Sequence, residues 1–179
     1  TAEQKAAINA LAEGETVTLN YPIEVSDGHG GVAYETISVT ITGSNDAPVF
    51  AGSSVFTASV TENELEGAAA YTLRGTLTGL DVDTTDDLSF GPSTRAGDAF
   101  SFSGSTVQSV TADTFGELTF SNTTASGDRG GSWTFEATTA AQKAAINALA
   151  EGETVTLNYP IEVSDGHGGV AYETISVTI

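Results

Sequence analysis

Oxygen-bearing side chains gather in three short segments of the chain, and their types suit a hard cation. One segment holds Asn45 and Asp46, the second reads DVDTTDD, and the third is SDGHGG, which contains Asp165. Ca²⁺ prefers six to eight oxygen ligands from carboxylates, amides and carbonyls. The spacing Asp81-x-Asp83 would let alternate residues at the end of a strand direct both carboxylates toward one ion. The Asn and Asp side chains of these segments are therefore candidate calcium ligands.

The same residue types have a second, purely structural reading. Asp, Asn and Gly favour turns, because their side chains bond to nearby backbone or tolerate positive φ. The formal charge of −19 with five basic residues disfavours nucleic-acid binding and contact with anionic lipid. Such an excess of negative charge repels itself unless counter-ions neutralise it. The acidity is consistent either with divalent cations or with solubility alone.

A tandem duplication determines how these segments are organised. Residues 4–41 recur without change at 142–179, at an offset of 138 residues. Identity of this extent exceeds what a fold requires, because cores tolerate many apolar substitutions. It indicates recent duplication, and it predicts a longer parent protein built from many identical repeats.

The elements that must position the acidic segments are mostly strands. In YETISVTI, at the end of the chain, apolar and polar residues alternate, which is typical of a strand with one buried face. Trp133 and Phe135 share one strand face and are expected in the core. Segments rich in Val, Thr, Ile, Phe and Tyr lie between turn residues and predict strands at 16–26, 32–42, 54–60, 71–80, 87–91, 98–103, 106–112, 116–121, 132–137, 154–164 and 170–179.

One Ala-rich segment, 139–153, has apolar residues at helical spacing and Gly152 placed to end a helix. It predicts a short helix between two late strands, with a copy at 1–15. The segment TGSNDAPVF marks a break, because Pro48 cannot donate a backbone hydrogen bond. Taking 42–48 as a linker divides the chain into 1–41, the last part of a preceding repeat, and 49–179, a complete repeat.

Several motifs together carry a family resemblance: GLDVD, GELTF, GGSWTF, INALAEGETVTLNYPIEVSDGHGG and ISVTITGSNDAPV. As a set they resemble the VCBS and cadherin-like repeats of large RTX-type bacterial adhesins, over essentially the whole period. The resemblance implies an all-β fold, a Greek-key β-sandwich of the cadherin or immunoglobulin type, with Ca²⁺ where successive repeats meet. It also implies a structural spacer on the bacterial cell surface that supports adhesion or biofilm formation. GHGGVAY departs from the RTX pattern, because it supplies one glycine cluster and no run of nonapeptides.

The usual seven-strand order of such repeats predicts where the acidic segments meet. The loops 81–87 and 164–169 would both return to the end of the repeat that carries the linker. By similarity to the N-D linker, the D-x-D motif and the later single Asp of cadherins, the metal ligands are expected to be Asn45, Asp46, Asp81, Asp83 and Asp165. Weaker candidates are Asp86, Asp87, Asp128, Glu62 and Glu64, with the two glutamates at the opposite end.

Catalysis is not expected. His29 and His167 are copies of one residue in a Gly-rich turn, and no nucleophile elbow, zinc-binding helix or phosphate loop is present. Cysteine is absent, which excludes disulfides and thiolate metal sites. No signal peptide and no apolar stretch of membrane-spanning length is found, so an export signal is expected elsewhere in the parent.

Two alternatives to the spacer function stay open at this stage. The repeat could bind a surface glycan through exposed aromatic residues, for which the candidates are Tyr34 with its copy Tyr172, Tyr71 and Phe115. Alternatively, the segment 1–41 lacks the strands that would cover it, so it could pair with its own chain or exchange strands with neighbouring chains to form a fibre.

Overall fold

The computed structural model describes residues 1–61, 71–104, 109–123 and 129–179. Within these ranges strands far outweigh helices, so the predicted all-β class is confirmed. The chain divides into two compact units. The first holds Thr1–Asp46 with Val82–Thr85, and the second holds Ala47–Asp81 with Asp86–Ile179.

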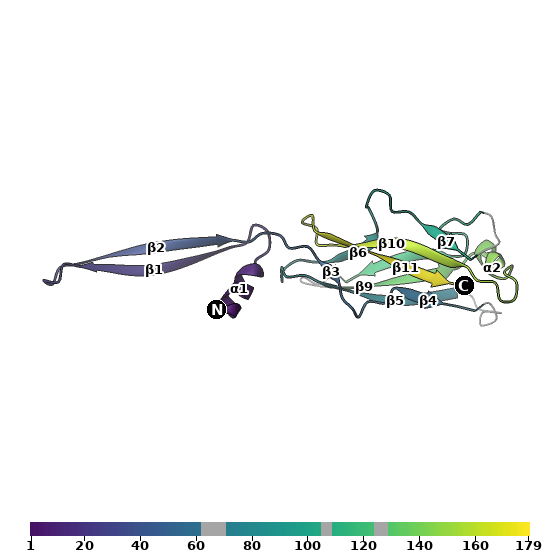
Figure 1. Cartoon of the computed structure of the whole chain (residues 1–179), viewed down its shortest axis with the longest axis horizontal. Helices are drawn as coiled ribbons and strands as arrows, with labels where there is room; N and C mark the ends of the chain where they lie inside the picture. Colours follow the sequence, from purple (N-terminus) through teal and green to yellow (C-terminus); the bar gives the residue numbers. More distant parts are fainter. Residues whose placement is uncertain (62–70, 105–108, 124–128) are drawn as a thin grey trace. The chain divides into compact units, whose positions relative to one another are not determined.

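The first unit consists of a helix and a long hairpin. Helix α1 (Ala2–Asn9) is capped by Thr1, whose hydroxyl accepts the backbone N–H of Gln4 in a capping box. Strands β1 (Thr16–Ser26) and β2 (Val32–Thr42) pair antiparallel along their whole length (Figure 1). At the turn between them, Asp27 Oδ1 accepts the backbone N–H groups of His29 and Gly31. These two hydrogen bonds hold the pKa of the Asp27 carboxyl below its usual value.

The second unit contains two sheets. One has the order β4-β11-β10-β6, with β7 also paired to β10, and the other has the order β3-β5-β9-β8. Strand β4 runs parallel to β11, whereas the other pairings between described strands are antiparallel. Their bounds are β3 Val49–Phe50, β4 Thr57–Ser59, β5 Tyr71–Leu80, β6 Ser89–Pro92, β7 Ser101–Ser103, β8 Glu117–Asn122, β9 Gly130–Ala137, β10 Thr156–Ser164 and β11 Val170–Thr178, with helix α2 at Ala140–Ile146.

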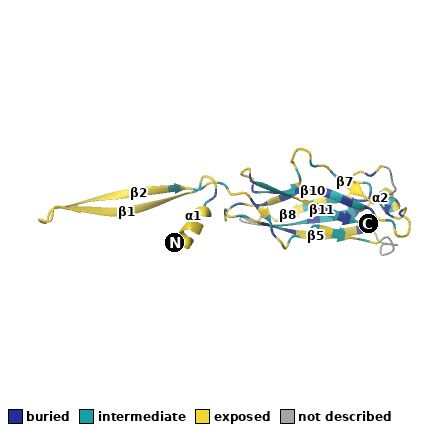
Figure 2. Ribbon diagram, in the orientation of Figure 1, coloured by how far each residue is buried: buried dark blue, intermediate teal, exposed yellow. Residues whose placement is uncertain are grey.

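One hydrophobic core is shared by the two sheets of this unit. Trp133 and Phe135 of β9 are 0% and 1% exposed, as their pattern predicts. Every second residue of β10 is buried against them, including Ile161 and Val163. The indole N–H of Trp133 donates to the backbone oxygen of Val55 at 2.7 Å, so this buried polar group is satisfied. Figure 2 shows the buried residues along β10 and β11.

Two local expectations are wrong. Residues 109–112, the described part of the strand expected at 106–112, form no strand, because side chains of the following turn compete for the backbone. Thr114 Oγ1 accepts the backbone N–H of Thr111, and the Thr111 hydroxyl donates to Asp113. The helix expected over 139–153 ends at Ile146, and a separate turn with Gly152 at φ 79° follows it.

The aromatic residues on which the glycan-binding alternative depends are mostly covered. Tyr71 is 4% exposed and Phe115 is 0% exposed, because both pack in the core. The ring of Tyr172 is covered by the guanidinium of Arg95, 4.5 Å from its centroid. Of the four candidates only Tyr34 presents an open ring.

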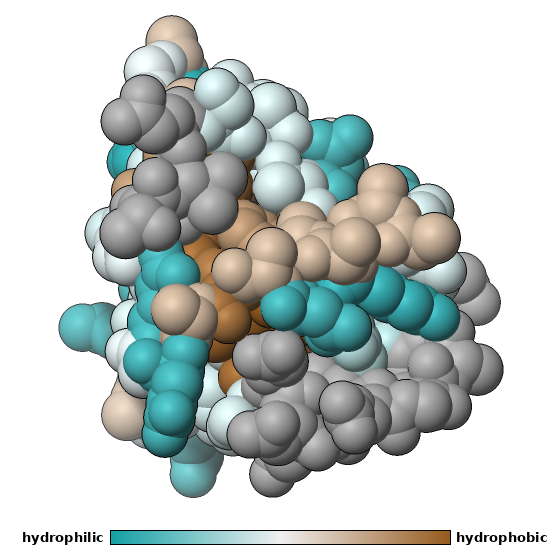
Figure 3. All heavy atoms as spheres, turned by 90° about the vertical axis from the view of Figure 1, so that its right-hand side faces the viewer, coloured by the Kyte–Doolittle hydropathy of each residue, from teal (hydrophilic) through white to brown (hydrophobic). Residues whose placement is uncertain are grey.

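The end of the second unit that carries α2 presents apolar surface near the middle of its face (Figure 3). A hollow of about 570 Å³ lies there, with Val60, Leu149 and Ile179 among its apolar lining residues. In the described part of the chain, neither helix has the length and apolar character needed to cross a membrane.

Adding a methyl group at Gly75 is expected to lower the free energy of unfolding by about 1–3 kcal/mol. Gly75 lies opposite Trp133 in the β5–β9 pair, and a Cβ there would come within 2.3 Å of the indole nitrogen. Urea unfolding of Gly75→Ala would measure the loss. Gly91→Ala is the matched control, because a Cβ at this strand position meets no atom within 4 Å. Equal stability of the two variants would contradict the packing argument.

Candidate metal site

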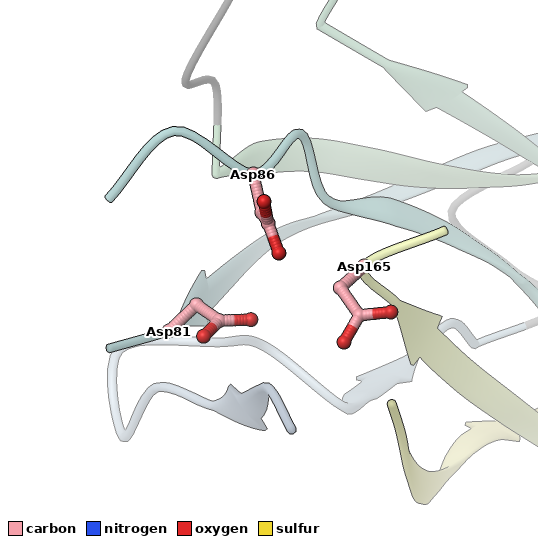
Figure 4. Close-up of side chains that lie close together, drawn as sticks. All are labelled: Asp81, Asp86 and Asp165. Atoms are coloured by element: carbon pink, nitrogen blue, oxygen red, sulfur yellow. The ribbon is translucent and has the colours of Figure 1, made fainter. Parts of the chain in front are cut away.

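Three aspartates from two loops converge at one end of the second unit. Asp81 directly follows β5, Asp86 precedes β6, and Asp165 directly follows β10. Each offers one carboxylate oxygen, and these three oxygens lie within 4.8 Å of one another. Figure 4 shows the three carboxylates directed into one space between their loops. We refer to Asp81, Asp86 and Asp165 as the aspartate triad.

The turn after β10 positions Asp165. Its Oδ1 accepts the backbone N–H of His167 at 2.7 Å and of Gly169 at 3.0 Å. Gly166 and Gly168 have φ of 80° and 103°, a region that favours glycine, so glycine suits both positions of this turn. The structural reading of Asp165 as a turn residue is therefore correct, and its carboxylate also belongs to the triad.

Burial makes the charge of the triad costly. Asp86 and Asp165 are 4% and 3% exposed, and Asp81 is half-buried. Two like charges about 4 Å apart repel by about 4 kcal/mol when the effective dielectric constant is about 20. Arg129 lies at the edge of the group and donates from Nη1 to the backbone oxygen of Asp81. A divalent cation between the three carboxylates would offset their mutual repulsion and stabilise this arrangement.

The donor atoms favour a hard cation over a soft one. All three triad ligands are carboxylate oxygens, which suit Ca²⁺, Mg²⁺ or Mn²⁺, whereas thiolates and imidazoles suit zinc and copper. His167 lies close by, with Nε2 3.8 Å from Asp86 Oδ1, but it is not a member of the triad. Ca²⁺ accepts irregular sets of carboxylates and carbonyls, whereas Mg²⁺ requires a nearly ideal octahedron.

The other predicted ligands lie in different surroundings. Asn45, Asp46 and Asp83 belong to the first unit, where the backbone N–H of Asp46 donates to Asp83 Oδ2 at 2.7 Å. Their place in a calcium site with Asp165 stays a prediction. Asp87 is exposed and outside the triad. Asp128, Glu62 and Glu64 lie outside the described residues.

The structure groups Asp81 with Asp86 and Asp165, and the place of Asp83 beside Asp81 at one ion stays a prediction. Residues 82–85 form a bend and a turn instead of prolonging β5, so Asp81 and Asp83 do not sit on alternate positions of one strand. The turn instead brings Asp86, a weaker candidate in the sequence, beside Asp81. Two neighbours of the triad, Arg129 and His167, were not anticipated. No signal in the sequence singles out Arg129, and His167 resembles an ordinary turn residue.

The duplicated copy of the turn provides an internal comparison. Asp27 closes the β1–β2 turn as Asp165 closes its own, with nearly the same distances. In the described ranges, however, Asp27 joins no group of three potential metal ligands. The turn sequence alone therefore does not form such a cluster; the loop between β5 and β6 supplies the other two carboxylates.

Neither a scan against protein-family models nor a search of curated proteins gives a match for this sequence.

Proposed function

We propose that this chain is a non-catalytic spacer from a tandem array of identical repeats in a secreted bacterial surface adhesin. In this proposal each repeat is a Greek-key β-sandwich of the cadherin type, and Ca²⁺ bound near the repeat junction stiffens the array. A stiff array would hold an adhesive module away from the cell and support adhesion or biofilm formation.

The observation that carries this proposal is the aspartate triad. Asp81 and Asp86 come from one loop and Asp165 from another that is far away in the sequence, and two of the three carboxylates are buried. Such a cluster is costly without a cation and stabilising with one. Asp81 directly follows Leu80, the partner of Val49 in β3, so the triad lies near the residues at which the second unit begins.

Two further features support the proposal. The 38-residue duplication is typical of tandem arrays whose repeats share one structural task. The net charge of −19 favours an environment rich in divalent cations, and the lack of cysteine means that a metal would be the available staple. The resemblance to VCBS and cadherin-like repeats assigns that environment to the cell surface.

Calcium is expected to bind the full chain and to stiffen the connection between its two units. Calorimetric titration should give a saturable heat with CaCl₂ and a much weaker one with MgCl₂. Small-angle scattering of the same samples should show a narrower distribution of maximum dimensions in calcium than in chelator. Binding without any change in scattering would retain the metal site but reject the stiffening function, and no binding would reject both.

A further inference from the structure

The hairpin β1–β2 has an apolar face that its identical copy β10–β11 buries completely. Ile23 and Val25 are 45% and 69% exposed, whereas their counterparts Ile161 and Val163 are 0% exposed. The same contrast holds on the second strand, where Ile37 is 50% exposed and Ile175 is 0% exposed. Figure 2 shows this contrast along the two hairpins. One sequence therefore has two different surroundings in one molecule.

The two hairpins nevertheless have the same conformation. Their pairing registers correspond residue by residue, with Thr18 opposite Thr40 and Thr156 opposite Thr178. Cross-strand bonds also recur: the hydroxyls of Ser38 and Ser176 donate to their asparagine partners at 2.7 and 2.8 Å. Because the exposed hairpin already has the shape of the buried one, it requires no refolding to enter the same surroundings.

The surroundings of β10–β11 come from a single stretch of chain, residues 49–138, which we call the scaffold segment. Within the described residues, its strands β6 and β7 pair with β10 and its strand β4 pairs with β11. Its strands β5 and β9 supply Leu77, Trp133 and Phe135 to the shared core. The two helices show the same contrast in burial: Ile8 of α1 is 43% exposed, and its counterpart Ile146 of α2 is 0% exposed.

The scaffold segment of this chain is already filled by the second copy of the hairpin. Strands β10 and β11 pair with its strands β6, β7 and β4, and Ile161, Val163 and Ile175 lie in the shared core. The hairpin β1–β2 could enter this place only by displacing its own copy. The partner must be a scaffold segment that is not already filled by its own hairpin.

We propose that residues 1–42 form a docking element that completes the scaffold segment, residues 49–138, of a second copy of this repeat. The element supplies a helix and two strands, and the scaffold segment supplies edge strands and the opposing sheet. The inference rests on the tandem arrangement in the proposed function, but it does not involve calcium, so docking is expected in chelator as well.

Co-expression tests this proposal. The full chain is co-expressed with an affinity-tagged fragment, residues 47–138, that contains the scaffold segment. The complex is purified in buffer that contains a chelator. The full chain is expected to co-purify in a 1:1 complex, and hydrogen exchange in β1–β2 is expected to slow. When the full chain carries Ile23→Asp, the amount that co-purifies should fall to background. Thr36→Asp is the matched control, because its counterpart Thr174 is exposed in the assembled unit, so this variant should bind as the unmodified chain does.

A tandem fusion covers the case in which the isolated scaffold segment is insoluble. Residues 47–138 are placed ahead of Thr1 in one chain, and Ile23→Asp is expected to unfold the added half while the second unit stays folded. Co-purification that survives Ile23→Asp, or a fusion that tolerates this change, would overturn the docking proposal. Calcium binding by the triad would be unaffected in either case, so the two proposals fail separately.

Discussion

Asp165→Asn is expected to weaken calcium binding by about 100-fold, whereas Asp27→Asn, the same substitution in the duplicated turn, leaves it unchanged. Asparagine keeps Oδ1 as an acceptor for the backbone N–H groups that close each turn, so both variants retain their hairpins. Only Asp165 belongs to the aspartate triad. The difference between the two variants therefore isolates the loss of one triad carboxylate.

The thermal stability of the second unit in calcium should also differ between Asp165→Asn and Asp27→Asn. Calcium at about a hundred times its Kd stabilises a folded state by about 2.7 kcal/mol, which for a unit of this size raises Tm by about 10 °C. Asp165→Asn should remove most of this gain. In chelator, Asp165→Asn should instead raise Tm slightly, because the substitution relieves repulsion among three close carboxylates.

Thermal unfolding of both variants in calcium and in chelator would measure these effects. Asp86→Asn provides a second test within the triad, since Asp86 lies outside the turn after β10. Equal calcium affinity in Asp165→Asn and Asp27→Asn would contradict the assignment of the triad as the binding site. A loss of affinity in both variants would place the ion in turns of the SDGHGG type.

The β-hairpins were predictable because one rule determines them. Strict alternation of apolar and polar residues specifies both the strand and the buried face, and both long strands of the first hairpin were predicted at their observed bounds, 16–26 and 32–42. Trp133 was predictable as a core residue for the same reason.

The metal site was predictable only in outline. Strand order predicts that the loops 81–87 and 164–169 meet, and the structure brings Asp81 and Asp165 together. The choice between Asp83 and Asp86 depends on the conformation of a short loop. Several turn types fit DVDTTDD, so its residues do not specify which carboxylate faces Asp165. The contact of Arg129 with Asp81 joins positions far apart in the chain, which no local pattern indicates.

Ile161→Asp is expected to unfold the second unit, whereas Ile23→Asp, the identical change in the first copy, is expected to shift its stability by less than about 0.5 kcal/mol. Ile161 is 0% exposed in the shared core, and Ile23 is 45% exposed. A buried, unpaired carboxylate combined with the loss of an isoleucine from the core should cost more than about 5 kcal/mol. That cost approaches the whole stability of an ordinary domain.

Trp133 is the one tryptophan of the chain, so its fluorescence and near-UV circular dichroism report on this core alone. The unmodified chain and Ile23→Asp should give the same spectra and urea midpoints, and Ile161→Asp should give the spectrum of an exposed indole. Because sequence, hairpin conformation and substitution are identical in the two copies, any difference between the variants comes from the scaffold segment. A large destabilisation by Ile23→Asp in the isolated chain would mean that the first hairpin is already covered, and it would contradict the exposed face from which the docking proposal starts.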